Sequence, residues 1–178
     1  SNNTAAGYYS MYYNTTGTQN AAFGKDAFRN GTTGSYNTAI GVSALQAVVT
    51  GANNTAVGRK AMYDNTSGAN NVAVGNSSLE NNTTGTSNTS VGSGALYNNT
   101  TANNNTATGY YALYANTTGT ENVAVGRGSA DANTTGNSNT ALGYNALTGN
   151  TTAHNNTAVG ANNLVTNTTG TRNTAVGA

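Results

Sequence analysis

The sequence has no cysteine, no proline and no tryptophan, and charged residues occupy only 6% of its 178 positions. The lack of cysteine excludes a disulfide framework and thiolate metal sites. Six Lys and Arg residues in a chain of net charge +1 are too few to neutralise a phosphate backbone, so we expect no nucleic-acid partner. No apolar run of about 20 residues and no signal-peptide pattern is present. We therefore expect that the chain does not insert into a membrane. We also expect that its targeting signals lie elsewhere in a longer protein.

What the chain does contain is 33 Asn, 33 Thr and 23 Gly, which together fill half of it. Such a composition is typical of disordered linkers, but here it is strictly periodic. The motif Asn-x-Ala-x-Gly, with Ser90 replacing Ala once, recurs every 17 residues without an insertion or deletion. It begins at Asn3, Asn20, Asn37, Asn54, Asn71, Asn88, Asn105, Asn122, Asn139, Asn156 and Asn173. A fixed period of this kind indicates a solenoid of stacked units.

Numbered from that Asn, the consensus unit is N-T-A-V-G-x-x-A-L-x-x-N-T-T-G-x-x. Gly in every unit argues against helix, T-A-V and A-L-x fit short strands, and G-x-x and N-T-T-G fit turns. We predict an all-β parallel β-solenoid with two strands per coil, a single domain over residues 1–178 of about ten and a half coils. Every charged residue and every Tyr falls at unit positions 6, 7, 10, 11 or 17, so these positions are predicted to face solvent.

Both faces of each predicted strand look buried. Position 3 is small and position 4 is large and branched, and positions 8 and 9 repeat this alternation. Because neighbouring strand residues point to opposite faces, one row should fill the coil and the other pack against a second chain. This favours a homo-oligomer, and a three-fold fibre would satisfy it; the alternative is a monomer with a half-exposed row. The uncapped edges predict either further sequence or end-to-end stacking into a filament.

The Asn at positions 1 and 12 should stack at the coil spacing and form amide ladders. The alternative for position 12 is glycosylation, because Asn-x-Thr and Asn-x-Ser are acceptor sequences. The candidate acceptors are Asn14, Asn65, Asn82, Asn99, Asn116, Asn133, Asn150 and Asn167, with further acceptor sequences at Asn30, Asn53 and Asn104.

The Thr pair at positions 13 and 14 raises an ice-binding alternative, but adjacent Thr alternate faces, so we expect the hydroxyls to satisfy turn backbone groups. Exposed Tyr side chains are the better candidates for a binding surface, since each offers an apolar face and a polar tip. The alternative is that they brace turns or line chain seams. The candidate ligand contacts are Tyr8, Tyr9, Tyr12, Tyr13, Tyr63, Tyr97, Tyr110, Tyr111 and Tyr114.

No arrangement of residues predicts catalysis. The five carboxylates are separated by whole coils, and the single His154 has no nucleophile recurring beside it; it is predicted to be a solvated turn residue. The periodic Gly pattern is not a phosphate loop. We therefore expect no enzyme, no cofactor and no metal site.

The stretch Asn54-Thr55-Ala56-Val57-Gly58 and its copies resemble the repeats in the heads of trimeric autotransporter adhesins. The 17-residue unit is also similar to arrays in bacterial and phage tail-fibre-domain proteins. The resemblance covers all 178 residues and implies a left-handed, usually trimeric β-roll displayed outside a cell or on a virion. The unit is longer than the autotransporter repeat, and no residue-level site carries over.

The expected function is that of an extracellular adhesive fibre which binds glycans or proteins of a host or cell surface through its variable turn positions. A purely structural filament, with or without glycans, is the alternative. An ice-binding solenoid is the third reading.

Overall fold

The computed structural model describes residues 2–48 and 50–177, so positions 1, 49 and 178 of the predicted domain lie outside the described residues. The predicted fold class is confirmed: eleven strands form one parallel sheet in chain order. The strands are β1 (Thr4–Ala6), β2 (Ala21–Phe23), β3 (Thr38–Ile40), β4 (Thr55–Val57), β5 (Val72–Val74), β6 (Thr89–Val91), β7 (Thr106–Thr108), β8 (Val123–Val125), β9 (Thr140–Leu142), β10 (Thr157–Val159) and β11 (Thr174–Val176).

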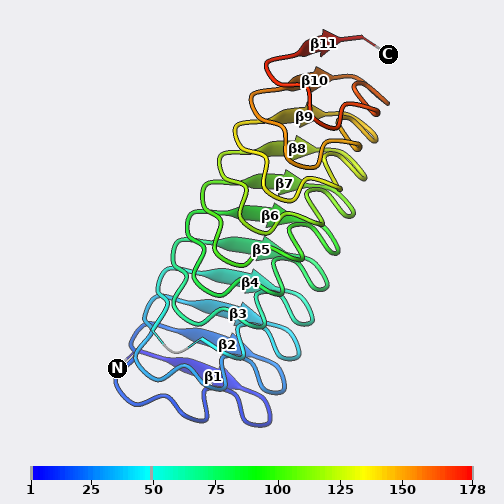
Figure 1. Cartoon of the computed structure of the whole chain (residues 1–178). Helices are drawn as coiled ribbons and strands as arrows, with labels where there is room; N and C mark the ends of the chain where they lie inside the picture. Colours follow the sequence, from blue (N-terminus) through cyan, green and yellow to red (C-terminus); the bar gives the residue numbers. More distant parts are fainter. Residues whose placement is uncertain (1, 49, 178) are drawn as a thin grey trace.

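Each strand pairs with the next at an offset of 17 residues, as in Thr55 opposite Val72 and Ala56 opposite Ala73. Because no register shift occurs between β1 and β11, each unit position forms a straight row along the stack. Figure 1 shows the coils piled in one direction, with the two ends of the chain at opposite ends of the stack. A side chain therefore meets the residue of the same unit position in the coils before and after it.

The prediction of two strands per coil is wrong, because each coil contains only one. Positions 7 and 9 have positive φ, as at Lys60 (56°) and Met62 (50°), so the backbone there turns and cannot extend. Ala61 and Met62 are both fully buried as a result. The small row at position 8 and the large row at position 9 thus fill the same interior. This segment therefore exposes no apolar row that a second chain would have to cover.

The one true strand does place its two rows on opposite faces. Ala56 and Ala73 at position 3 are fully buried, whereas Val74 and Val91 at position 4 are 36% and 37% exposed. The small row is therefore internal and the branched row lies on the outside of the sheet.

The predicted set of solvent-facing positions is correct only in part. Positions 6 and 17 are largely exposed, but most residues at positions 7, 10 and 11 are half-buried, and Glu80 at position 10 is buried. Positions 4 and 14 are exposed although they carry no charge. The neutral Thr and Val rows therefore also form part of the surface, beside the variable turn residues.

Two features of the backbone require Gly at position 5. Gly109 has a φ of 136°, which L side chains rarely adopt, and a Cβ there would lie 2.5 Å from the carbonyl oxygen of Gly126 in the next coil. The chain bends out of the strand at this point, and adjacent coils touch backbone to backbone.

Position 1 forms the first amide ladder. The Oδ1 atom of Asn88 accepts the backbone N–H of Asn105 at 3.0 Å and its Nδ2 at 3.3 Å. The Nδ2 atom of Asn88 donates to the Ala102 carbonyl of its own coil at 2.8 Å. The backbone contact recurs at every step from Asn3 to Asn173.

Position 12 forms the second ladder. Five consecutive side-chain links join Asn65 to Asn150, with Nδ2 to Oδ1 distances of 2.8–3.0 Å. The Nδ2 atom of Asn99 also donates to the Ala102 carbonyl at 3.2 Å, the same oxygen that accepts from Asn88. The carbonyl at position 15 therefore joins both ladders inside each coil, and the prediction of amide ladders is confirmed.

The second ladder is interrupted near the N-terminal end of the stack. Gly31 and Val48 occupy position 12 in the two coils that follow Asn14. A Cβ on Gly31 would overlap the ring of Phe28, which is fully buried and replaces the usual Leu. The buried Oδ1 atom of Asn14 consequently has no hydrogen-bond partner. The ring of Phe28 thus occupies the space of an amide at position 12, and the ladder has no member in the coils of Gly31 and Val48.

We predict that Asn99→Ala lowers the free energy of unfolding by about 2–4 kcal/mol, because it leaves several buried polar groups without partners. Thr101→Ala, at an exposed position two residues away, should change it by less than about 0.5 kcal/mol. Denaturant unfolding followed by circular dichroism measures both. Equal stability of the two variants would contradict the ladder's role.

Candidate ligand-binding surface

One long side of the solenoid is formed by unit positions 6, 7, 10 and 11, and we call it the turn face. Its side chains are held by backbone bonds between coils. The backbone N–H of Tyr111 at position 7 donates to the Ser93 carbonyl of the preceding coil at 3.1 Å. The backbone N–H of Leu113 at position 9 donates to the Ser129 carbonyl of the following coil at 3.0 Å. The positive φ of both residues produces this alternation. Side chains on the turn face therefore project from a fixed backbone.

The first aromatic cluster on the turn face consists of Tyr8, Tyr9, Tyr12 and Tyr13. Successive ring centroids lie 4.0, 4.9 and 4.8 Å apart. The guanidinium group of Arg29 in the next coil lies 5.0 Å from the Tyr9 ring centroid. This cluster is thus associated with a cation, a partner that the sequence prediction did not include.

The second aromatic cluster consists of Tyr97, Tyr110, Tyr111 and Tyr114. Tyr97 and Tyr114 stack at 5.3 Å with an interplanar angle of 14°, and Tyr111 lies 4.7 Å from Tyr114 and 4.0 Å from Tyr110. A hydrogen bond with Tyr111 is the main cause that raises the pKa of Tyr110 above its ordinary value. The Tyr110 hydroxyl therefore stays protonated near pH 7.

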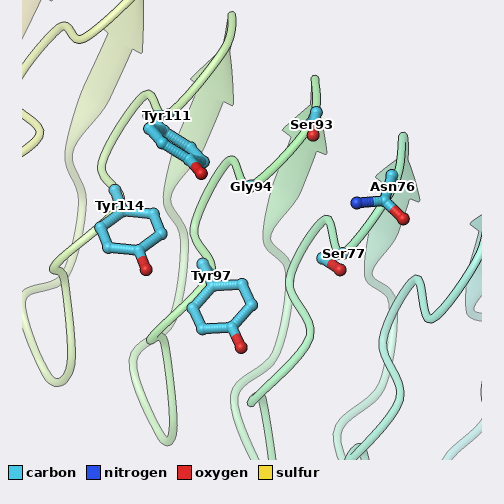
Figure 2. Close-up of a pocket in the computed structure, with 7 residues that line it drawn as sticks. All are labelled: Asn76, Ser77, Ser93, Gly94, Tyr97, Tyr111 and Tyr114. Atoms are coloured by element: carbon cyan, nitrogen blue, oxygen red, sulfur yellow. The ribbon is translucent and has the colours of Figure 1, made fainter.

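A pocket of about 210 Å³ lies beside this second cluster, lined by Asn76, Ser77, Ser93, Gly94, Tyr97, Tyr111 and Tyr114. Figure 2 shows the three rings on one side and the Ser and Asn side chains on the other, with Gly94 between them. A Cβ on Gly94 would overlap the Tyr111 ring. The pocket was not predicted, although Gly at position 7, where eight of ten units carry a side chain, was its signal in the sequence.

Comparison with known proteins adds no identity. No protein-family model, curated protein or solved structure matches the chain. The resemblance to adhesin heads and tail-fibre-domain proteins stays a prediction.

The remaining candidate, Tyr63, belongs to neither cluster. Its ring lies 5.1 Å from the Nζ atom of Lys60, which also forms an ion pair with Glu80 at 3.2 Å. The nine predicted contact residues thus form two clusters and one separate ring, not one continuous surface. Arg127 and Tyr144, joined by a cation–π contact of 5.6 Å, extend the second cluster and were not among the predicted contacts.

The candidate glycosylation sites at position 12 are unsuited to modification in the folded chain. Six of the eight, from Asn65 to Asn150, are fully buried, and their Nδ2 atoms donate within the ladder and to position 15. Asn14 and Asn167 are half-buried, and each donates Nδ2 to a turn carbonyl. Acceptor sequences with exposed Asn side chains do occur elsewhere, among them those of Asn53 and Asn104 at position 17.

His154 is not a freely solvated turn residue, which corrects the prediction. Its Nδ1 atom accepts the backbone N–H of Asn137 at 2.9 Å, as the Oδ1 atom of Asn103 does for Thr86 at 2.7 Å. His154 therefore takes the place of a turn-bracing amide. Within residues 2–48 and 50–177, no cluster of three or more His, Asp or Glu is placed to hold a metal ion. The same residues include no helix long and apolar enough to cross a membrane.

The Thr hydroxyls at position 13 satisfy backbone groups as predicted. The Oγ1 atom of Thr83 donates to the Thr100 carbonyl at 3.0 Å, and Thr100 repeats the contact with Thr117 at 3.2 Å. Position 14 projects outward instead. The adjacent Thr pair thus divides between the two sides of the backbone.

Asp64 provides a test of the electrostatics on the turn face. Partial burial raises the pKa of its carboxyl above the ordinary value of 3.8, the charge of Glu80 raises it further, and Lys60 lowers it. The folded chain then holds this proton more tightly than the unfolded chain. The stability from this group is present at low pH and is lost as pH rises from about 3.8 through the higher folded pKa.

We therefore predict that Asp64→Asn raises the thermal unfolding midpoint by about 1 °C at pH 7, where the folded carboxylate is disfavoured. The difference should disappear below pH 3, where the wild-type carboxyl is protonated in both states. Differential scanning calorimetry at the two pH values measures this. A lower midpoint at pH 7 would show that the attraction of Lys60 dominates instead.

Proposed function

We propose that this chain is a structural and adhesive segment of an extracellular fibre, exposed on a cell surface or a virion. Its turn face binds glycans or proteins of another cell. The outer face of its sheet, formed by the position-4 side chains and called the sheet face, holds copies of the chain together as a homotrimer. The observation that carries the proposal is the clustering of Tyr side chains on one side of a scaffold whose interior barely varies between coils.

The turn face supports the adhesive part of the proposal. Tyr8, Tyr12 and Tyr110 are 63%, 59% and 46% exposed, although burial of their rings would be favourable. Aromatic residues held in fixed positions on a rigid backbone lose little entropy when they bind. Interior rows are nearly invariant while the turn positions vary from coil to coil, so binding residues can change there without disturbing the stack.

The sheet face supports the oligomeric part. Position 4 presents a row of branched or aromatic apolar side chains along the outside of the sheet, among them Phe23, Ile40, Val74, Val91 and Val125, which are 36–42% exposed. A row that is apolar in every coil except that of Thr108 is unusual for a monomeric surface. Three copies arranged around a common axis would each cover this row with the rows of the other two.

We predict that light scattering gives three times the 17.8 kDa sequence mass. Val74→Lys combined with Val91→Lys should yield monomers, because the charges would be buried at the seam. Thr84→Lys, at the exposed position 14, is the matched control and should remain trimeric. A monomeric wild-type chain would refute the trimer and leave the turn-face proposal in place.

Binding to a glycan array and to intact cells tests the adhesive function. The wild-type chain should bind in at least one of the two assays, and truncation of the clustered Tyr side chains to Ala should abolish the signal. If a correctly folded chain binds in neither assay, only the alternative of a purely structural filament remains.

A second candidate function, ice binding, is favoured by the outer side of the sheet and not by the Thr pair from which it was first considered. Thr55 and Val57 both project outward from β4, and strand pairing in register repeats such pairs at about 4.8 Å along the stack. The result is a regular array of hydroxyl and methyl groups. Thermal hysteresis that is lost in the Val74→Lys, Val91→Lys variant would support this function, and its absence in the wild type would exclude it.

A further inference from the structure

The pocket beside the second aromatic cluster is shaped by the absence of a side chain. Ser77 and Tyr111 adopt φ values of 54° and 57° at position 7, close to the 65° of Gly94. The left-handed conformation therefore does not require Gly at this position. What requires it is space, because any Cβ at Gly94 would overlap the Tyr111 ring that leans over it.

A second Gly replaces the usual larger residue of position 7 on the other side of Tyr111. Gly128, one coil further along, also occupies position 7. It lines a second, smaller pocket together with Tyr110, Tyr111, Asn145 and the charged Arg127 and Asp131. Gly94 and Gly128 are the only glycines at position 7 in the chain, and they lie in the coils directly before and after Tyr111. The Tyr111 ring thus separates two adjoining hollows, each open to solvent.

The chemistry of the larger pocket is neutral and amphipathic. One wall consists of the Tyr97, Tyr111 and Tyr114 rings (Figure 2). Opposite them are the side chains of Ser77 and Ser93, for which the described residues provide no hydrogen-bond partner. No charged residue lines the pocket. Such a site fits a ligand that has an apolar face, a rim of hydroxyl groups and no charge.

The size of the pocket further limits the kinds of ligand that fit. At about 210 Å³ it is smaller than the roughly 300–1,000 Å³ of pockets that enclose drug-sized molecules, so it accommodates one ring and not an extended peptide. A hexopyranose meets each condition, since its C–H groups form an apolar face and its hydroxyls lie around the edge. The second hollow on the far side of Tyr111 would take a neighbouring sugar unit.

We propose that Tyr111 and the flanking Gly94 and Gly128 form a binding site for neutral hexopyranose units of a glycan. A sugar ring stacks on Tyr111 in the larger pocket, and its hydroxyls bond to Asn76, Ser77 and Ser93. This inference rests on the adhesive function proposed above and names its ligand class. It also assigns different roles to the two clusters, since the Tyr8, Tyr9, Tyr12 and Tyr13 cluster has Asp26 at position 7 of the next coil and Arg29 over its rings.

The test is a titration of the full chain with the methyl glycosides of glucose, galactose, mannose and N-acetylglucosamine, followed through the Tyr ring signals by NMR. At least one glycoside should shift the Tyr111 and Tyr97 signals in a saturable way. Tyr111→Ala should weaken its binding about tenfold or more. Gly94→Ser should do the same by crowding the ring, and because Ser77 adopts this conformation, the variant should fold normally.

Tyr36→Ala is the control, because Tyr36 is an exposed Tyr at unit position 17 that belongs to neither Tyr cluster. It should leave glycoside affinity unchanged. If no glycoside shifts the Tyr111 signals, or if Tyr111→Ala retains wild-type affinity, the inference is overturned. Should the wild type still bind cells in either case, the adhesive function stands and only this site fails; a wild type that binds neither cells nor glycans refutes both.

Discussion

The structure depends on the carbonyl oxygen at position 15, where two asparagine ladders meet. Each coil encloses so narrow an interior that its backbone polar groups cannot reach water, and buried groups of this kind must be paired. In the coil of Asn88 and Asn99, both side chains donate to the Ala102 oxygen, and their own Oδ1 atoms accept from the next coil. The amides thus act as polar spacers of one fixed size. An insertion or deletion in any coil would displace both ladders, which explains why the period of 17 is strict.

The same constraint makes unfavourable backbone conformations tolerable. Each coil has three residues with left-handed φ, at positions 7, 9 and 17, and most are not Gly, as at Leu96 (48°) and Leu113 (51°). A left-handed L-residue costs about 1 kcal/mol or more. In the inner coils each of these residues donates its backbone N–H to a carbonyl of an adjacent coil, as Leu96 does to Ala112 at 3.0 Å. A coil is therefore stable only beside its neighbours, and the rigid turn face that carries the Tyr clusters results from this mutual support.

The sequence predicts whatever depends on rows of identical residues. The period, the parallel stack, the Gly of position 5 and the two amide ladders all follow from recurrence at one unit position. The single strand per coil could not be predicted, because Leu at position 9 gives no sign of a left-handed φ and its alternation with Ala imitates a strand. The burial of the position-12 Asn could not be predicted from their acceptor sequences, because an acceptor sequence does not show whether the side chain is accessible to a modifying enzyme. The features specific to individual coils were present only as exceptions to the repeat: Phe28 with Gly31, and Gly94 and Gly128 around Tyr111.

The central claim is that Asn forms hydrogen-bonded rows inside the solenoid, at position 1 from Asn3 to Asn173 and at position 12 from Asn65 to Asn150. Hydrogen exchange of the side-chain Nδ2 protons, measured by NMR, tests it most directly, and the chain contains its own reference in the exposed Asn53 and Asn104 at position 17. The account predicts that the Nδ2 protons of ladder residues such as Asn88 and Asn99 exchange as slowly as the strand amides, while those of Asn53 and Asn104 exchange at the rate of free amides. Equally fast exchange at all of these positions would contradict it.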